Sequence, residues 1–362
     1  MQALQLYAGP TALQKIQRDG LRAEDFRMIV GASGGPKWFV LYGLDRYLFG
    51  DFFAGRQQPL MTLGSSAGAW RLACLGLADP VAAMDRLAFH YSRQRYSDKP
   101  LMQEISHEAR KLVDIVLGAN GPAEIVGNRL VSVHIVADRA RGLLKSDKKV
   151  LLMGGLGLCA AANVISRRTL RMSFERVIFH SGRLAPGFDR LADMPTRCVP
   201  LREDNVREAL LASGSIPMIM EGVRNVPGAP AGVYRDGGIT DYHFDMPFLS
   251  AGSDGGHLVL YPHFYSRLTP GWFDKALRWR RVNPAHYHNV LLLAPSPEFV
   301  RALPYGKIPD RKDFEIMDYD TRFTYWQRVL AESERLAEEF AALVESERGV
   351  ERIRPFAEMR HH

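Results

Sequence analysis

The chain has 362 residues, of which 46% are hydrophobic and 24% are charged, as in an ordinary globular protein. This length can bury a large core and fits one large domain with insertions, or one domain with a smaller appendage. The net charge of +7 allows attraction to phosphate groups, on nucleic acid or on anionic lipid, without choosing between them. The three widely spaced cysteines include no CxxC pair, which argues against a disulfide framework or a zinc site and indicates a reducing compartment.

We expect no signal peptide, because the first residues lack a basic start followed by an apolar block, and no apolar run reaches the roughly 20 residues that a membrane-spanning helix needs. We therefore expect a cytoplasmic protein, with peripheral contact to a membrane as an open alternative. The nearest candidate for such contact is Val150–Ser166, which carries no charge and is flanked by lysines and arginines. We expect this stretch to form a buried strand and helix, the alternative being a surface that touches a membrane.

Apolar runs that read as strands alternate with runs of helical periodicity. The predicted strands cover residues 26–33, 58–64, 129–139, 175–182, 257–264 and 289–296. The predicted helices cover 37–50 and 66–80, the latter ending at Pro80, and helical patterns continue to about residue 118. This alternation predicts an α/β fold with a mainly parallel sheet covered by helices.

The C-terminal part of the sequence changes character. Apolar residues over 323–344 fall on one helical face, opposite a face rich in glutamate and arginine. We expect one helix there, packed on the main domain. The predicted division is therefore a domain over 1–300 and a helical extension over 301–362.

A Gly-x-Ser-x-Gly motif, formed by Gly64, Ser66 and Gly68, follows one predicted strand and precedes a predicted helix. In a nucleophile elbow the residues two before and two after the serine must be tiny, because the backbone passes close on both sides. Ala67 adds no bulk either. Such a turn places the serine hydroxyl at a helix N-terminus, where free N–H groups support a developing oxyanion. The alternative is a serine in a loop of small residues.

A second glycine cluster, Gly31–Trp38, also lies between a predicted strand and a predicted helix. A phosphate-binding P-loop is excluded by Pro36 and Trp38, and the glycine spacing does not fit a dinucleotide fingerprint. Gly34 and Gly35 could expose backbone N–H groups to an oxyanion, each worth roughly 3 kcal/mol in a transition state. The alternative is a tight turn that caps the helix.

A third cluster, Asp236-Gly237-Gly238, follows a short run that reads as a strand. An aspartate at the end of a strand would be exposed toward any site that lies at the ends of the strands. Taken alone, Asp-Gly favours a type I′ hairpin turn.

The three clusters together resemble the patatin-like phospholipase family, whose pattern is a glycine-rich oxyanion loop ending in Arg or Lys, then GxSxG, then DGG or DGA. The matching positions are Gly34, Gly35 and Lys37, then Gly64, Ser66, Ala67 and Gly68, then Asp236, Gly237 and Gly238. The segment 209–220 is also similar to the family's Ala-Ser-x-x-Pro segment. The glycine loop departs from the family at Ala32, Ser33 and Trp38.

This resemblance implies a three-layer α/β/α patatin-like fold and hydrolysis of lipid acyl esters by a dyad of Ser66 and Asp236. Gly34 and Gly35 would form the oxyanion hole. The implied partner is a phospholipid or another acyl-ester lipid, with no metal and no cofactor. Because an aspartate near its ordinary pKa of about 4 is a poor base, burial would have to raise its pKa.

Two other functions stay open at this point. An α/β-hydrolase would use a Ser-Asp-His triad, with the histidine drawn from His243, His257, His263, His286 and His288. The short spacing between Gly35 and Ser66 argues against that fold. A catalytically silent lipid-binding protein would be favoured by a broken nucleophile or acid, and neither is broken. A nucleic-acid binder is disfavoured, because the basic residues are scattered and no known binding motif is present.

The stretch Phe264–Val282 mixes aromatic and basic residues, which suits a membrane interface. We expect a partly buried helix with a solvated cationic face. The alternative hypothesis is that this stretch helps the protein dock on phospholipid.

Overall fold

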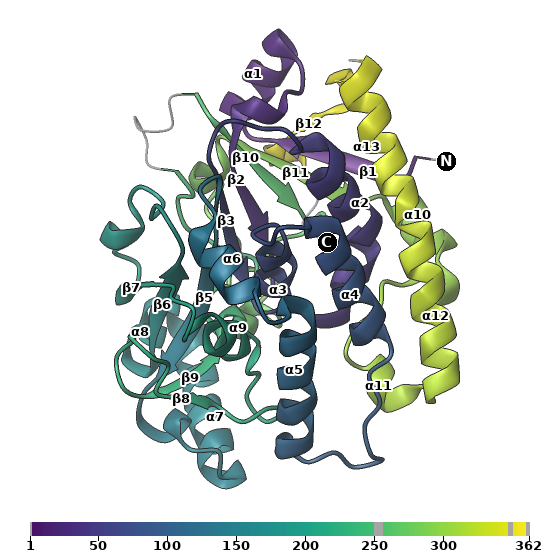
Figure 1. The fold of residues 1–362 in the computed structure, drawn as a ribbon. Helices are drawn as coiled ribbons and strands as arrows, with labels where there is room; N and C mark the ends of the chain where they lie inside the picture. Colours follow the sequence, from purple (N-terminus) through teal and green to yellow (C-terminus); the bar gives the residue numbers. More distant parts are fainter. Residues whose placement is uncertain (1, 250–255, 347–349, 360–362) are drawn as a thin grey trace.

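The structure, a computed structural model, describes residues 2–249, 256–346 and 350–359 (Figure 1). Within that part the chain is an α/β protein built on one mixed, mostly parallel sheet of twelve strands. Their order is β12-β1-β11-β10-β2-β3-β5-β6-β7; in addition, β4 pairs with β3, β9 pairs with β5, and β8 pairs with β9. The strands are β1 (Leu4–Ala8), β2 (Phe26–Gly31), β3 (Leu60–Ser65), β4 (Val131–Ser132), β5 (His134–Ala140), β6 (Phe174–His180), β7 (Thr196–Pro200), β8 (Val223–Arg224), β9 (Val233–Asp236), β10 (Leu258–Pro262), β11 (Val290–Pro295) and β12 (Arg354–Pro355).

Thirteen α-helices accompany these strands within the described residues. They are α1 (Pro10–Asp19), α2 (Tyr42–Tyr47), α3 (Ala67–Cys74), α4 (Pro80–Ser92), α5 (Met102–Leu117), α6 (Gly121–Gly127), α7 (Lys149–Ile165), α8 (Leu170–Ser173), α9 (Val206–Gly214), α10 (Pro297–Ala302), α11 (Asp313–Ile316), α12 (Tyr319–Glu332) and α13 (Glu334–Ser346).

The four central strands confirm the predicted parallel sheet. β11, β10, β2 and β3 are neighbours in this order and all pair in parallel. Almost every residue in them is buried, on both faces of each strand. That explains why they read as continuous apolar runs and not as alternating ones.

Four strand pairs in the described residues are antiparallel, which the sequence pattern did not indicate. β6 and β9 both run antiparallel to β5, β8 runs antiparallel to β9, and β1 runs antiparallel to β11. Strand orientation is set by how the chain returns to the sheet, which local periodicity does not record. The sheet is thus mixed, although most of its pairings are parallel.

Two predicted helices differ from those observed. The helix predicted over 37–50 begins as a 3₁₀ segment, Gly35–Leu41, and only then continues as α2. The helix predicted over 66–80 ends at Cys74, and Pro80 opens α4 instead of stopping α3. The Asp79 side chain accepts a hydrogen bond from the Ala82 amide at 2.9 Å, so Asp79 caps α4 with proline at its first turn.

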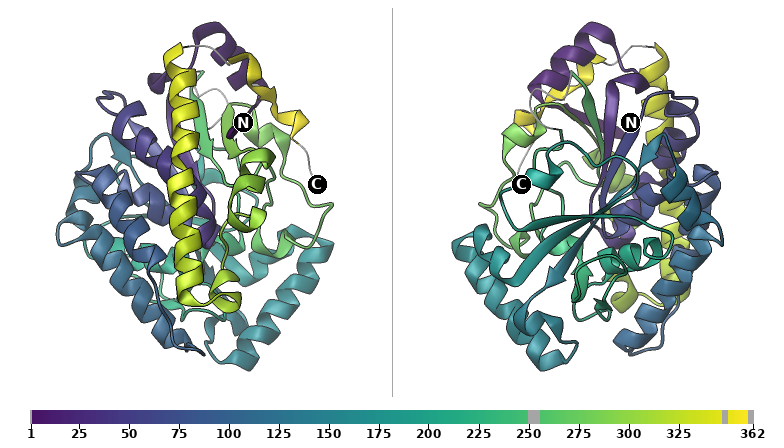
Figure 2. Two further views of the ribbon diagram at one scale, coloured as in Figure 1. Left: turned by 90° about the vertical axis from the view of Figure 1, so that its right-hand side faces the viewer. Right: turned by 60° about the vertical axis from the view of Figure 1, so that its left-hand side comes forward.

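The single helix predicted over 323–344 is wrong in detail, because two helices meet at Ser333. The Ser333 hydroxyl accepts a hydrogen bond from the Gly43 amide at 2.8 Å, which joins this break to α2. Phe39 and Trp326 add a ring contact, with centroids 5.2 Å apart. Figures 1 and 2 show α12 and α13 running along the side of the molecule that carries α2 and α4. The C-terminal segment also adds β12 to the sheet beside β1.

The buried strand and helix predicted over Val150–Ser166 are also wrong. This stretch is one helix, α7, with a buried face formed by residues such as Leu152 and Cys159 and an opposite face in solvent. No helix in the described ranges combines the length and apolar character needed to cross a membrane.

Candidate active site

Ser66 and Asp236 are brought together by the edge of β5. Along this edge, Ser65 at the end of β3 pairs with Val136. At the next position Ala137 pairs with Asp236, the last residue of β9, which runs in the opposite direction. Two strands that approach along one edge from opposite ends therefore place the serine and the aspartate next to each other, although 170 residues separate them.

The backbone at Ser66 has the geometry of a nucleophile elbow. Its φ is 54° and its ψ is −129°, a combination that residues with a side chain rarely adopt. A Cβ on Gly64 would lie 2.5 Å from the Ala69 Cα, and one on Gly68 would lie 2.0 Å from the Gly31 carbonyl oxygen. Both glycines of the motif are therefore required by contact between backbones, and α3 begins directly after the serine at Ala67.

The two side chains form a direct hydrogen bond. The Ser66 hydroxyl donates to Asp236 Oδ2 at 2.6 Å, and the Gly238 amide donates to Oδ1 at 2.7 Å. Both residues are 5% exposed. Burial raises the pKa of Asp236 to about 6, although the hydrogen bonds from Ser66 and Gly238 oppose that rise. The carboxylate is thus mostly ionised at neutral pH and is a stronger base than an ordinary aspartate.

The glycines after Asp236 serve close packing, not a hairpin. The Asp-Gly-Gly stretch enters a short 3₁₀ turn, Gly237–Ile239, and not the type I′ hairpin that Asp-Gly alone favours. A Cβ on Gly237 would lie 2.2 Å from the Val136 carbonyl oxygen, and one on Gly238 would lie 2.4 Å from the Ser33 hydroxyl. Side chains here would push the aspartate away from the serine.

Two serines of the segment 209–220 hold Ser66 and Asp236 in place, and sequence reasoning assigned them no role. The Ser213 hydroxyl accepts a hydrogen bond from the Ser66 amide at 2.8 Å and donates to the Val136 carbonyl at 2.7 Å. The Ser215 carbonyl accepts from the Asp236 amide at 2.9 Å. One short segment therefore anchors the backbone of both residues. The similarity of 209–220 to a family segment was the signal that could have pointed to them.

The glycine loop lies against the same site. Gly34 and Gly35 line the cavity that contains Ser66 and Asp236, and the 3₁₀ segment after them begins at Gly35. The first N–H groups of a helix have no partner inside it, so amides at this position are available to a ligand. The φ of Gly35 is +55°, and a Cβ on Gly34 would lie 2.5 Å from the Phe264 ring. Glycine is thus required at both positions.

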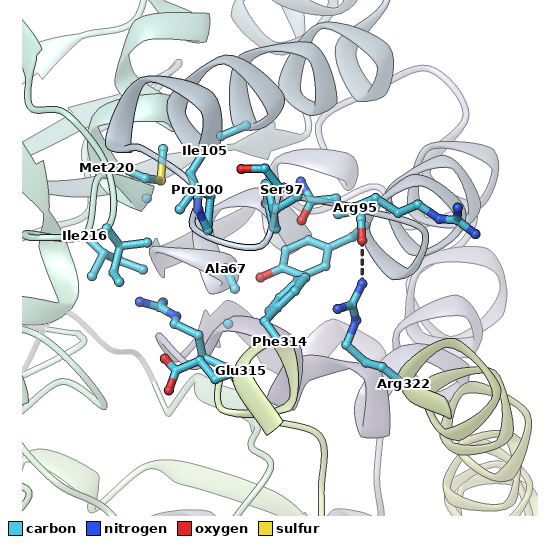
Figure 3. Close-up of a pocket in the computed structure, with 18 of the residues that line it drawn as sticks. Ala67, Arg95, Ser97, Pro100, Ile105, Ile216, Met220, Phe314, Glu315 and Arg322 are labelled. Carbon is cyan, nitrogen blue, oxygen red and sulfur yellow. Dashed lines mark hydrogen bonds between the residues drawn. The ribbon is translucent and has the colours of Figure 1, made fainter. Parts of the chain in front are cut away.

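Two cavities meet at Ser66. The larger has a volume of about 770 Å³ and the smaller about 200 Å³, and both are lined by Gly35, Ser66, Ile216 and Arg311. Much of the larger cavity is apolar. Figure 3 shows Ile105, Ile216 and Met220 on one side of it and Phe314 on the other, with Ala67 between them. Its size suits a small-molecule or acyl-chain ligand.

The smaller cavity is cationic. Lys37, Lys275 and Arg311 all line it. Lys275 as a whole is an exposed residue, but its ammonium lies 3.8 Å from the centroid of the Tyr242 ring. Partial removal from water, together with the cations of Lys37 and Arg311, lowers the pKa of Lys275 to about 7. Burial also lowers the pKa of Lys37. In their protonated forms, these side chains place positive charge around the position where an anionic part of a substrate would lie, and such an anion would favour the protonated forms.

Within the described part of the chain, no histidine lines either cavity at Ser66. His243 accepts a hydrogen bond from the Thr269 amide at 2.9 Å, and burial holds its pKa well below the usual value. His263 contacts the backbone of Tyr265. The serine hydroxyl instead bonds directly to the carboxylate, an arrangement that argues against a triad.

The stretch Phe264–Val282 is not one helix. It contains a single 3₁₀ turn, Trp272–Asp274, and Trp272 lines the smaller cavity while remaining 43% exposed. The Arg280 side chain donates to the Asn163 carbonyl at 2.7 Å, so this arginine has a structural role.

No protein-family model matches this chain, and no curated protein sequence matches it. The geometry of the site is therefore the basis for the functional argument.

Proposed function

We propose that this protein hydrolyses carboxylic esters of lipids through a Ser66–Asp236 dyad. The observation that carries the proposal is the 2.6 Å hydrogen bond from the Ser66 hydroxyl to a buried carboxylate, at an elbow where two cavities meet. A nucleophile in direct contact with a base is the feature common to serine hydrolases. With the elbow and the glycine loop, it also supports a patatin-like fold with helical layers on both faces of the sheet.

In the proposed first step, the Ser66 oxygen attacks the ester carbonyl carbon and its proton passes to Asp236. The amides of Gly34 and Gly35, with the start of α3, would hold the oxyanion. The tetrahedral intermediate then expels the alcohol, which takes the proton from Asp236. An acyl group remains on the serine oxygen.

In the second step, water gives a proton to Asp236 and its oxygen attacks the acyl carbon. The second tetrahedral intermediate releases the carboxylic acid, and the proton returns to the serine oxygen. Because Asp236 is the proton carrier in both steps, its raised pKa of about 6 favours catalysis near neutrality.

The cavities favour a lipid with an anionic group as the substrate. The apolar part of the larger cavity would take an acyl chain, because it is lined by side chains such as Ile105, Met220 and Phe314. The cations of the smaller cavity would face the alcohol part of the ester. A phospholipid meets both requirements, since a phosphate lies close to its ester bonds.

The test is ester hydrolysis by the purified protein, with p-nitrophenyl esters of increasing chain length and with a phospholipid. We expect turnover that falls by at least about 10³-fold in Ser66→Ala and in Asp236→Asn. His243→Asn is the matched control for the triad, because the amide oxygen can still accept the Thr269 hydrogen bond, and we expect it to stay active. Turnover that survives in Ser66→Ala refutes the proposal. Absence of turnover in the parent protein favours a silent lipid-binding role.

A further inference from the structure

The exposed side of α7 carries large apolar side chains, which are normally buried in a protein. Val150, Leu158 and Ile165 are 82%, 66% and 86% exposed, and they lie on one side of the helix with Leu151, Met153 and Val164. We call these six residues the α7 face. The opposite side of the helix is packed on the protein through Leu152, Cys159 and Asn163. A helix that is apolar on both sides normally has something covering each of them.

The α7 face is bordered by positive charge. Between Lys149 and Arg167 there is no charged residue, whereas three lysines precede and three arginines follow the face in sequence. They are Lys145, Lys148, Lys149, Arg167, Arg168 and Arg171. No acidic residue occurs from Lys148 to Met172. Apolar side chains bordered by lysine and arginine are the arrangement that binds the surface of an anionic bilayer.

The aromatic and basic stretch at 272–281 is attached to the packed side of α7 and carries further exposed aromatic residues. The Asn163 side chain donates to Asp274 at 2.7 Å, and Arg280 donates to the Asn163 carbonyl, so the stretch is joined to the C-terminal half of α7. Trp279 is 65% exposed there. Trp272 is both exposed and part of the lining of the smaller cavity at Ser66. Trp272 thus links this stretch to the cavity at Ser66.

The cavity and α7 also lie toward the same end of the molecule. In Figures 1 and 2, α7, α11 and the chain that leads into α5 are all at the end opposite α1. Residues of α11 and of the segment before α5 line the larger cavity. A flat membrane in contact with α7 would thus lie at the same end of the molecule as the larger cavity, into which the acyl chain of the substrate would have to pass.

We propose that the α7 face, with Trp272 and Trp279, docks this protein on an anionic lipid bilayer. The apolar side chains enter the headgroup region while exposed flanking cations such as Lys148, Lys149 and Arg168 meet lipid phosphates. A second copy of the chain is a poorer occupant. In a symmetric dimer formed through this face, the same cations would be brought against each other.

Binding is best measured on the Ser66→Ala protein, so that the result does not depend on the proposed hydrolysis. Flotation with vesicles of phosphatidylcholine mixed with phosphatidylglycerol should recover the protein. Vesicles of phosphatidylcholine alone should recover much less. Leu158→Asp should weaken binding to the mixed vesicles at least about tenfold, since a charge at the interface opposes insertion. The matched control is Leu130→Asp, an exposed leucine before β4, which should bind as the parent does.

A second variant removes the charge and leaves the apolar residues in place. Lys148→Gln, Lys149→Gln and Arg168→Gln combined should weaken binding to the anionic vesicles by roughly fivefold for each residue. All three side chains are exposed, so the fold should tolerate the change. Unchanged binding in the Leu158→Asp protein would overturn the proposal. So would a dimer of the parent protein that Leu158→Asp converts to monomer, because the occupant would then be a second copy.

Discussion

The strained backbone of Ser66 leads to a stability prediction that is separate from activity. At φ 54° and ψ −129° a residue with a side chain costs about 1–3 kcal/mol, and glycine does not bear this cost. Glycine loses more backbone entropy on folding, which offsets about 0.5–1 kcal/mol. Ser66→Gly should therefore be about 1 kcal/mol more stable than Ser66→Ala, and both should be inactive.

The comparison with alanine isolates the backbone. Both variants lose the hydroxyl and its bond to Asp236, so the effect of that loss cancels between them. Urea unfolding of the two proteins gives the difference directly, and thermal unfolding should show a gap of about 2 °C. If Ser66→Gly is no more stable than Ser66→Ala, the elbow is not strained and the argument from its geometry is wrong.

Three further predictions concern the chemistry of the site. The kcat/KM should fall about tenfold per pH unit below pH 6, because Asp236, with its pKa raised to about 6, must be ionised to accept a proton; a profile flat down to pH 5 would contradict this. Ser213→Ala should lower the free energy of unfolding by about 1–3 kcal/mol and also reduce kcat, because the Ser66 amide and the Val136 carbonyl lose a buried partner. Denaturant unfolding and steady-state kinetics would measure both effects, and an unchanged kcat would remove the anchoring role. Lys275→Met should raise KM about fivefold for an anionic ester and leave KM for a neutral ester of equal chain length unchanged. Equal effects on both esters would show that Lys275 acts through packing and not through charge.

The central parallel strands and the sharp turn at Ser66 could be predicted because their signals are local. Buried parallel strands such as β2 and β11 are continuous apolar runs, and an elbow requires small residues at fixed positions around Ser66. The Asp-Gly-Gly stretch was ambiguous alone and became informative only in combination with the other two glycine clusters.

What the sequence could not provide depends on contacts between distant segments. β3 and β9 meet along one edge of β5 although they are far apart in the sequence. The contact of Ser213 with the Ser66 amide is also between distant segments. The helix break at Ser333 serves a contact with Gly43, almost 300 residues earlier. The apolar run in α7 looked buried because hydrophobicity does not say which side of a helix is covered.

The central claim is that the hydroxyl of residue 66 is acylated during turnover. The most direct measurement is reaction of the protein with a fluorophosphonate ester, followed by mass spectrometry of its peptides. We predict one adduct, on the Ser66 oxygen, with a labelling rate that drops sharply in Asp236→Asn. An adduct on any other residue, or equal labelling of the two proteins, would contradict the account.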